Sequence, residues 1–271
     1  MSKGQAVEDI ILGAANALMA ASRDQKPIAP IAADFGDNAD LDAAYAVQEH
    51  VTKAALAEGR RLVGRKIGLT SVAVQAQMGV DQPDYGMLFA DMEYADGETI
   101  PAGMFIQPKV EAEIAFVLGR DLPSQDLTVN ELIGAIDYAL PAMEIVDSRI
   151  RDWKIGILDT IADNASSGGY VLGSRPVRLA DFDLRLCGMV MERLGQPVSF
   201  GAGMACMGNP LIAAQWLARK MAEVGRPLCA GDVILSGALG PMVAARPGDS
   251  FRVAINGLGD VNTYFAKGES A

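Results

Sequence analysis

The chain has 271 residues, of which 50% are hydrophobic and 21% are charged, so it has the composition of a folded globular protein and not of a disordered one. Acidic residues outnumber basic ones by 34 to 23, and the net charge of −11 argues against a nucleic-acid partner. No stretch has the length and apolar character of a membrane-spanning helix, so no membrane partner is expected either.

Histidine and cysteine are scarce. His50 is the single histidine, which excludes hydrolases built on a Ser-His-Asp triad and metal sites built from several histidines. Cys187, Cys206 and Cys229 are too scattered for a disulfide framework, and the amino-terminal residues do not resemble a signal peptide. We therefore expect a cytoplasmic protein in which carboxylates and lysines carry out any acid–base chemistry.

Two helices are predicted at the amino-terminal end. Apolar residues recur at helical spacing over residues 6–22. A second helix is expected to begin near Asn38 or Asp40 and to end at Gly59. His50 lies on this second helix, where a solvent-facing position is the favoured interpretation.

Short apolar runs separated by Gly, Pro and Asp predict strands from residue 62 onward, at 62–67, 109–118, 142–146, 169–172, 188–193, 232–236, 251–255 and 261–265. Two helices interrupt them. One, over 132–140, follows a capping box of Thr128 and Glu131, and the other, over 211–224, follows Asn209-Pro210. Because no βαβ rhythm is present, we predict an α+β fold in which a helical region (1–60) packs on a largely β catalytic domain (61–271).

Two carboxylates two residues apart are the strongest local signal for a functional site. Glu111 and Glu113 lie in an apolar strand, where residues at i and i+2 face the same side. Glu144 lies in a second apolar strand. Converging carboxylates repel one another, and a hard divalent cation such as Mg²⁺ or Mn²⁺ removes that repulsion. The alternative is that Glu111 and Glu113 form an exposed strand face and that Glu144 pairs with an arginine.

Four further segments carry candidate functional residues. Lys66 lies in an apolar strand that ends at Gly68, as a lysine held in a pocket would. Asp84 follows a proline, and a turn-capping role is the favoured local interpretation for it. The small polar stretch 163–169 precedes a strand, as a substrate-contacting loop or a plain turn would. The glycines in 236–241 end another strand, where they would present backbone N–H groups to an anion.

Several of these segments together resemble one enzyme family. They are GRKIGLT (64–70), GVDQPDYG (79–86), EAE (111–113), PAME (141–144), DNAS (163–166) and GALGPM (237–242). In this order they are similar to the hydratase/decarboxylase branch of the fumarylacetoacetate hydrolase superfamily, over residues 40 to 265. One departure is Asn209, where relatives often carry a histidine; Asn209 also suits the start of a helix.

The resemblance implies a small helical amino-terminal region and a mixed β-roll catalytic domain. It implies that Glu111, Glu113 and Glu144 hold Mg²⁺ or Mn²⁺ and that Lys66 and Asp84 are catalytic. We expect the substrate-binding residues to be Ser166, Gly237 and Leu239. The implied reaction adds water to a small 2-hydroxy-dienoate, 2-hydroxypenta-2,4-dienoate, and gives 4-hydroxy-2-oxopentanoate in the meta-cleavage catabolism of aromatic compounds. We further expect a homo-oligomer.

Three alternatives remain open on the sequence. The first is 4-oxalocrotonate decarboxylase, which shares the fold and the metal site of the branch and with which the hydratase can form a complex. The second is a hydratase specific for a dicarboxylate, which would need an extra cationic group. The third is a non-catalytic partner subunit of the decarboxylase, and the intact carboxylates at 111, 113 and 144 argue against it.

Overall fold

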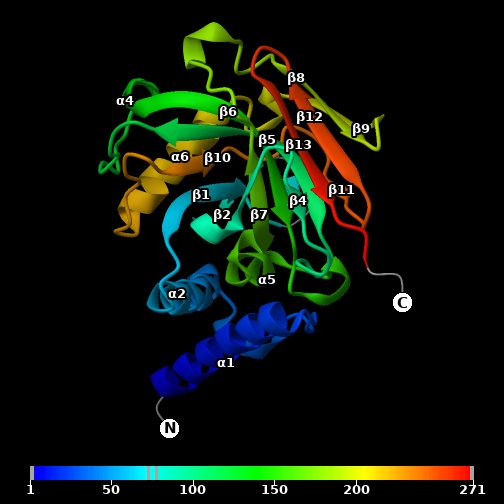
Figure 1. The fold of residues 1–271 in the computed structure, drawn as a ribbon. Coiled ribbons are helices and arrows are strands. Elements are labelled where there is room, and N and C mark those ends of the chain that lie inside the picture. The colour runs from blue at the N-terminus through cyan, green and yellow to red at the C-terminus, as the bar shows by residue number, and fades with distance from the viewer. Residues whose placement is uncertain (1–2, 72–73, 77–78, 269–271) are drawn as a thin grey trace.

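The computed structural model describes residues 3–71, 74–76 and 79–268, and two mixed β-sheets make up most of them (Figure 1). The larger sheet has the order β2-β1-β10-β5-β6-β7-β3, with β11 paired to the amino-terminal end of β5. Its strands are β1 Leu62–Gly68, β2 Asp84–Phe89, β3 Glu93–Ala95, β5 Lys109–Leu118, β6 Ile136–Val146, β7 Ser167–Leu172, β10 Val233–Leu235 and β11 Val243–Ala244.

The smaller sheet has the order β4-β13-β12-β8-β9. Its strands are β4 Thr99–Ile100, β8 Gly188–Arg193, β9 Gln196–Ala202, β12 Ser250–Ile255 and β13 Gly259–Phe265. Within these two sheets, the pairs β1–β10, β3–β7 and β4–β13 are parallel, and the other described pairs are antiparallel.

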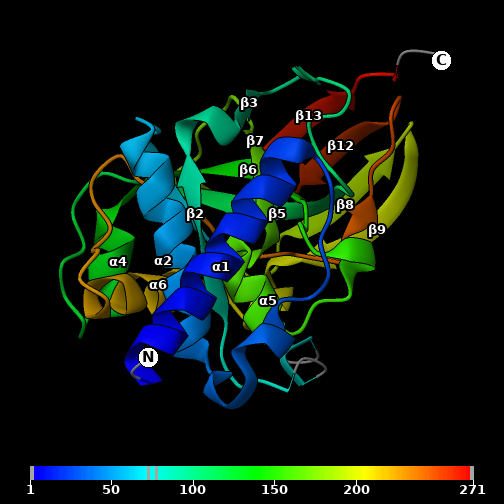
Figure 2. The same cartoon turned by 90° about the horizontal axis from the view of Figure 1, so that it is seen from below.

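The helices lie in two groups, one below the sheets and one beside them (Figure 1). They are α1 Lys3–Asp24, α2 Leu41–Ala57, α4 Val129–Ala135, α5 Ile157–Ala162 and α6 Pro210–Glu223. Figure 2 shows α1 crossing the underside of the molecule, with α5 behind it and α2 beside it. Short 3₁₀ turns occur at Ala32–Asn38, Ala90–Met92, Arg151–Trp153, Asn164–Ser166, Leu179–Asp181 and Gly203–Ala205. The predicted α+β class is confirmed.

The helix starts follow their capping residues. The side chain of Asp40 accepts a hydrogen bond from the amide of Ala43 at 2.8 Å and begins α2. Asn209 accepts one from the amide of Leu211 at 3.0 Å and begins α6. The unusual Asn209 therefore has a structural role in this chain.

The predicted helix over 132–140 is wrong in its second half. Its capping box is present, but α4 ends at Ala135 and β6 begins at Ile136. Residues 136–146 are strand because β6 lies between β5 and β7, and its pairing along nearly the whole of β5 outweighs local helical preference. The sequence patterns also missed β2, β9 and the short strands β3, β4 and β11, as well as α5.

Two hydrophobic clusters fill the interior. The larger joins both sheets to α6 and includes Ile114, Phe116 and Leu217, all of them fully buried. The smaller lies between α1 and α2 and also takes in Ile150 and Ile161 from beyond residue 60. Gln48 lies on α2, and its buried side-chain amide donates to the carbonyls of Tyr85 and Ile161. Among the helices in the described ranges, none is both long enough and apolar enough to cross a membrane.

Candidate active site

Three glutamates converge because two neighbouring strands bring them to one face. In the antiparallel pairing of β5 with β6, Glu111 lies directly opposite Glu144, and Glu113 follows two residues along the same face of β5. One carboxylate oxygen from each residue lies within 4.8 Å of the others. Glu113 and Glu144 are fully buried and Glu111 is half-buried. The alternative of an exposed strand face formed by Glu111 and Glu113 is therefore wrong, because Glu113 is fully buried and Glu111 is half-buried.

Burial of these carboxylates favours their protonated, neutral forms. Burial, followed by repulsion from Glu144, raises the pKa of Glu111 to about 7. The same two causes hold the pKa of Glu113 well above its usual range, and burial raises that of Glu144. The buried Oε1 of Glu113 also lacks a hydrogen-bond partner among the described residues. A cluster of this kind, with oxygen donors only, fits a hard divalent cation.

Lys66 supplies a buried positive charge beside these acids. Its Nζ lies 3.1 Å from Oε1 of Glu144, and both side chains are almost fully buried. Burial by itself would lower the pKa of Lys66, but the carboxylates of Glu144, Asp84 and the other two glutamates raise it above its ordinary value. The partner of Glu144 is therefore a lysine and not an arginine, and Lys66 carries a charge at neutral pH.

Asp84 lies beside Lys66 in the buried chamber that these two residues form with Glu111, Glu113 and Glu144. The turn-capping interpretation of Asp84 is therefore wrong. It is the first residue of β2, is 1% exposed, and its carboxylate oxygens have no hydrogen-bond partner of acceptable geometry among the described residues. Burial raises the pKa of Asp84 to about 6, and the charge of Lys66 opposes this shift. A Cβ on Gly68 would lie 2.2 Å from Oδ1 of Asp84 and 3.6 Å from Nζ of Lys66. Glycine at 68 therefore leaves the space in which both groups meet.

The Gly237 segment closes the chamber beside Glu113. The amide of Gly237 donates to Oε2 of Glu113 at 2.7 Å, so this backbone N–H does meet an anion, as the glycine pattern predicts. Gly237 has a φ of +102°, and a Cβ there would lie 2.4 Å from Cγ2 of Thr70. Leu239 is buried, and its amide donates to the carbonyl of Ala112 at 2.9 Å. Its backbone therefore ties this segment to β5.

Ser166 lies in an uncommon turn before β7. Asn164, Ala165 and Ser166 have φ values of 55°, 52° and 54°, which are left-handed conformations. Such a conformation costs a residue other than glycine about 1–2 kcal/mol, so three in succession must be held by their surroundings. The hydroxyl of Ser166 is buried and has no hydrogen-bond partner among the described residues. The next hydroxyl, of Ser167, lies close enough to Glu144 to lower its pKa slightly.

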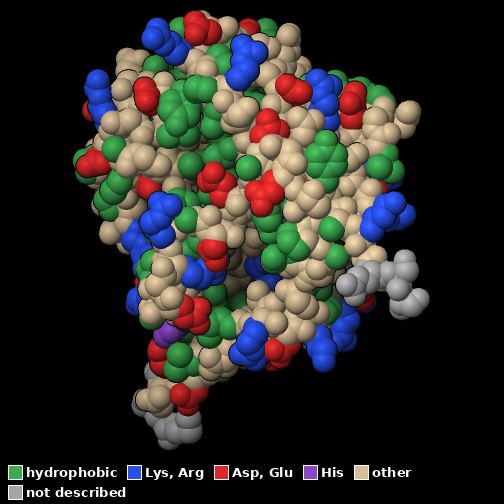
Figure 3. Space-filling view, in the orientation of Figure 1, with side chains coloured by type: hydrophobic (Ala, Val, Ile, Leu, Met, Phe, Trp, Pro, Cys, Tyr) green, Lys and Arg blue, Asp and Glu red, His purple; other side chains and the backbone are tan. Residues whose placement is uncertain are grey.

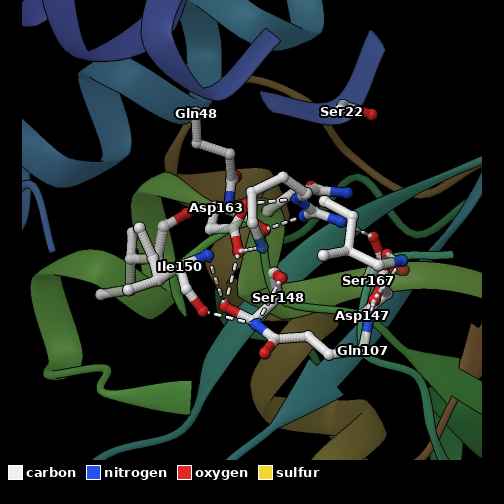
Figure 4. Close-up of polar contacts among 12 residues, drawn as sticks. Ser22, Gln48, Gln107, Asp147, Ser148, Ile150, Asp163 and Ser167 are labelled. Carbon is white, nitrogen blue, oxygen red and sulfur yellow. Dashed lines mark hydrogen bonds and ion pairs between the residues drawn. The ribbon is translucent and has the colours of Figure 1, made fainter. Parts of the chain in front are cut away.

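A largely buried arginine that the sequence patterns missed contacts both ends of this turn. Arg149 donates through its guanidinium to the Asp163 carboxylate, to the Asp163 carbonyl and, at 2.9 Å, to the Ser167 carbonyl (Figure 4). Ser148 also donates to Asp163, and burial raises the pKa of Asp163 to about 6 while Arg149 opposes the shift. The available signal was a basic residue five positions after Glu144, in the segment that follows the PAME motif.

A cleft of about 990 Å³ lies outside the carboxylate chamber. Helices α1 and α2 form one wall, and residues of the 147–168 region form another, among them Asp147, Arg149, Asp163 and Ser167. Figure 3 shows the surface hollowed above α1. None of the three glutamates, Lys66 or Asp84 lines this cleft, so it borders the turn and not the acid cluster.

Comparisons with known proteins agree with this geometry. Residues 43–266 match the family described as fumarylacetoacetate (FAA) hydrolase C-terminal. The chain is 62% identical to "2-keto-4-pentenoate hydratase 1" of Dechloromonas aromatica over 93% of its length and 96% of the relative. It is 63% identical to "TodF product hydratase" of Pseudomonas putida, over 94% of each protein.

A solved structure resembles the whole fold. It is 4-oxalocrotonate decarboxylase from Pseudomonas putida G7, complexed with magnesium and adipate, which matches with a TM-score of 0.91 and 36% identity over 98% of both chains. The family suggested by the six motifs is thus confirmed. This chain belongs to the fumarylacetoacetate hydrolase family.

Proposed function

We propose that this protein is a metal-dependent hydro-lyase that adds water to 2-hydroxypenta-2,4-dienoate to give 4-hydroxy-2-oxopentanoate. The observation that carries the proposal is the identity of 52–63% over almost the whole chain to proteins named as hydratases of 2-keto-4-pentenoate or of the TodF product. The decarboxylase of known structure is much less similar in sequence, at 36%. This difference favours hydration over decarboxylation, and the names of the hydratase relatives support a role in the catabolism of aromatic compounds.

The chain's own carboxylates are suited to hold the metal ion. Glu111, Glu113 and Glu144 would bind it, and the magnesium in the related decarboxylase structure supports Mg²⁺ or Mn²⁺ as its identity. When bound, such an ion supplies Lewis-acid chemistry to an anionic 2-oxo or 2-hydroxy acid. Gly237 orients Glu113 through its amide, and Lys66 orients Glu144.

Lys66 and Asp84 are the proton-handling pair in this proposal. The positive charge of Lys66 would attract the anionic substrate and orient its oxygens. Hydration moves one proton to C5 and adds water at C4, so the site needs a group that can exchange protons near neutral pH. Asp84, with a pKa raised to about 6 and both oxygens unpartnered, meets this requirement. We assign Asp84 to steering the proton or water that reaches C5 or C4.

The remaining site residues shape the chamber around the substrate. Ser166 offers a free buried hydroxyl, Gly237 allows close approach of the backbone, and Leu239 offers a buried apolar side chain. An apolar side chain beside the small hydrocarbon end of a pentadienoate excludes bulk water from the reacting carbons. These three roles complete the proposed set of substrate contacts.

The second candidate function is decarboxylation of 4-oxalocrotonate. It is favoured by the similarity of the whole fold to a decarboxylase that was solved with adipate, a dicarboxylate. A distal carboxylate would need an additional cation. In the described part of the chamber, Lys66 already faces Glu144 and Asp84 and so does not supply that additional cation. The hydratase is therefore the first candidate. A complex with such a decarboxylase remains part of the proposal.

We also propose a homo-oligomer in the cytoplasm. The edge strand β9 carries no charged residue, and Phe200 on it is 64% exposed, which supports a buried contact in an assembly. The three cysteines are unpaired, which supports a reducing compartment. Light scattering of the protein and of a Phe200→Asp variant tests the assembly, and a smaller mass for the variant is expected.

The function is tested by supplying Mg²⁺ and enzymatically generated 2-hydroxypenta-2,4-dienoate. The conjugated absorbance should disappear, and mass spectrometry should identify 4-hydroxy-2-oxopentanoate. In parallel, 4-oxalocrotonate should release little carbon dioxide. Rapid release of carbon dioxide without hydration of the dienoate would give the assignment to the decarboxylase.

A further inference from the structure

The turn that carries Ser166 is held from outside the chamber. Its three left-handed residues include no glycine, so the conformation depends on contacts made by neighbouring segments. Asn164 is fixed on one side, where its side chain accepts from the amide of Met87 at 2.7 Å and donates to the carbonyl of Met87 at 3.0 Å. This pair of bonds ties the start of the turn to β2, the strand that begins with Asp84.

Arg149 fixes the other side of the turn. Its guanidinium spans from Asp163, which precedes the turn, to the carbonyl of Ser167, which follows it. Its own amide also donates to the Asp163 carboxylate at 2.9 Å. A planar guanidinium presents several donors in fixed directions, whereas a lysine ammonium cannot serve three separated acceptors in this way. Arg149 is thus suited to hold the two ends of the turn at a set separation.

The chain connects this contact to the metal-binding glutamates. Arg149 comes five residues after Glu144, at the end of β6, and the amide of Asp147 donates to the carbonyl of Ser166 at 2.8 Å. Asp147 in turn accepts from the amides of Ile106 and Gln107, just before β5. Figure 4 shows Ser148 next to Asp163, and Asp147 nearby beside Ser167 and Gln107. The segment 144–149 therefore begins at a proposed metal ligand, Glu144, and holds the 164–166 turn through Asp147 and Arg149.

We propose that Arg149, acting through Asp163 and the Ser167 carbonyl, is a positioning residue that holds the 164–166 turn so that the Ser166 hydroxyl faces the oxygens of the anionic substrate. This inference rests on the proposed hydratase function and deepens it. Arg149 does not touch the substrate or the metal ligands, so its loss should act on substrate binding more than on the chemical step.

The main experiment compares Arg149→Ala and Arg149→Lys with the wild type in steady-state hydration of 2-hydroxypenta-2,4-dienoate. Loss of one positioned hydrogen bond to a charged group corresponds to about a tenfold effect or more, so kcat/KM should fall by about that factor, mostly through a higher KM. Arg149→Lys should not restore it. The control is Arg60→Ala, because Arg60 lines the same cleft and pairs with Asp91 but, among the described residues, makes no hydrogen bond to the turn. Its kcat/KM should stay within about twofold of the wild-type value.

Two further measurements separate positioning from a general loss of structure. Arg149 lines the cleft of about 990 Å³, so added ethylguanidinium can reach the space that Arg149→Ala leaves, and it should lower KM back toward the wild-type value. A double-mutant cycle with Ser166→Ala should be strongly non-additive, because both changes remove the same substrate contact. No recovery with ethylguanidinium together with additive effects would overturn the proposal.

A readout without turnover keeps this inference separate from the proposed function. Hydrogen exchange of the peptide spanning 163–168 should be faster in Arg149→Lys than in the wild type and unchanged in Arg60→Ala. If the wild type does not hydrate the dienoate but the exchange result holds, the proposed function fails and the positioning contact stands. If the wild type is active and Arg149→Lys matches it in both exchange and KM, the positioning role is wrong.

Discussion

Two buried polar clusters in this molecule balance their charges in opposite ways. Around Arg149, the carboxylates of Asp147 and Asp163 accept several hydrogen bonds each, from backbone amides and from the arginine. Around Glu113 and Glu144, three carboxylates share one lysine, and the buried Oε1 of Glu113 has no hydrogen-bond partner among the described residues. A cluster satisfied by the protein stabilises the fold by itself, whereas an unsatisfied one is stabilised when a ligand supplies the missing charge.

The largest expected effect comes from removing one carboxylate of the cluster formed by Glu111, Glu113 and Glu144. Glu113→Gln should abolish hydration because it removes a proposed metal ligand, while the shape of the side chain is kept. The metal-free variant should melt at or above the wild-type temperature, since a buried glutamine is neutral by itself, whereas burial of Glu113 without metal requires that it take up a proton. Differential scanning calorimetry with and without Mg²⁺ checks this, and Asp137→Asn, an exposed position on β6, is the control. Full activity of wild type in excess chelator would contradict the metal requirement.

Changes to the proton-handling pair come next. Lys66→Met and Asp84→Asn should each lower kcat by about 10²–10⁴-fold, the usual contribution of general acid–base groups. Lys66→Met should also lower the melting temperature of the metal-free protein more than that of the Mg²⁺-loaded protein, because the cation then replaces the lost positive charge. Near-normal kcat in both variants, or loss of activity that follows unfolding, would leave the pair with a structural role only.

Substitutions in the cluster of Arg149, Asp147 and Asp163 should lower the free energy of unfolding whether or not metal is present. Asp163→Ala leaves a nearly buried arginine without its carboxylate, and breaking a buried pair from one side costs about 3 kcal/mol. Asp91→Ala removes an exposed partner from Arg60 and should cost about 1 kcal/mol or less. Urea denaturation at pH 7.5, with and without Mg²⁺, measures both. A cost for Asp163→Ala that disappeared with Mg²⁺ would mean that the two clusters are not distinct.

The smallest expected effect is in the pH dependence of metal binding. The pKa of Glu111 is raised to about 7 without metal, so below that pH the metal-free site holds protons that the bound ion must displace. As the pH rises from 6 to 7, the apparent Kd for Mg²⁺ should therefore decrease, by up to about tenfold for each proton that the ion displaces. Above pH 8 the Kd should change less. Calorimetric titrations in buffers of different ionisation enthalpy count the protons released. A Kd that did not vary over this range would contradict the raised pKa.

Much of the site was readable from the sequence by itself. The spacing of Glu111 and Glu113 in an apolar strand requires that they share a face, because side chains alternate along a strand. The capping residues of α2 and α6 predicted where those helices begin, because a cap is a contact within a few residues. The family motifs then indicated Glu144, Lys66 and Asp84 as partners of this face.

Other features were decided only by the tertiary structure. Residues 136–140 carry a helical pattern but form strand, because pairing with β5 and the bridge of Ala139 to Val177 supply more backbone hydrogen bonds and burial than a longer α4 would. Asp84 reads locally as a turn residue, and it is buried because β2 pairs with β1 across Gly68. The contact of Arg149 with Asp163 joins residues whose roles become visible only when β6 and the 163–167 segment lie side by side. Local patterns determine caps and strand faces, but the partner of a buried charge depends on which distant segments the fold brings together.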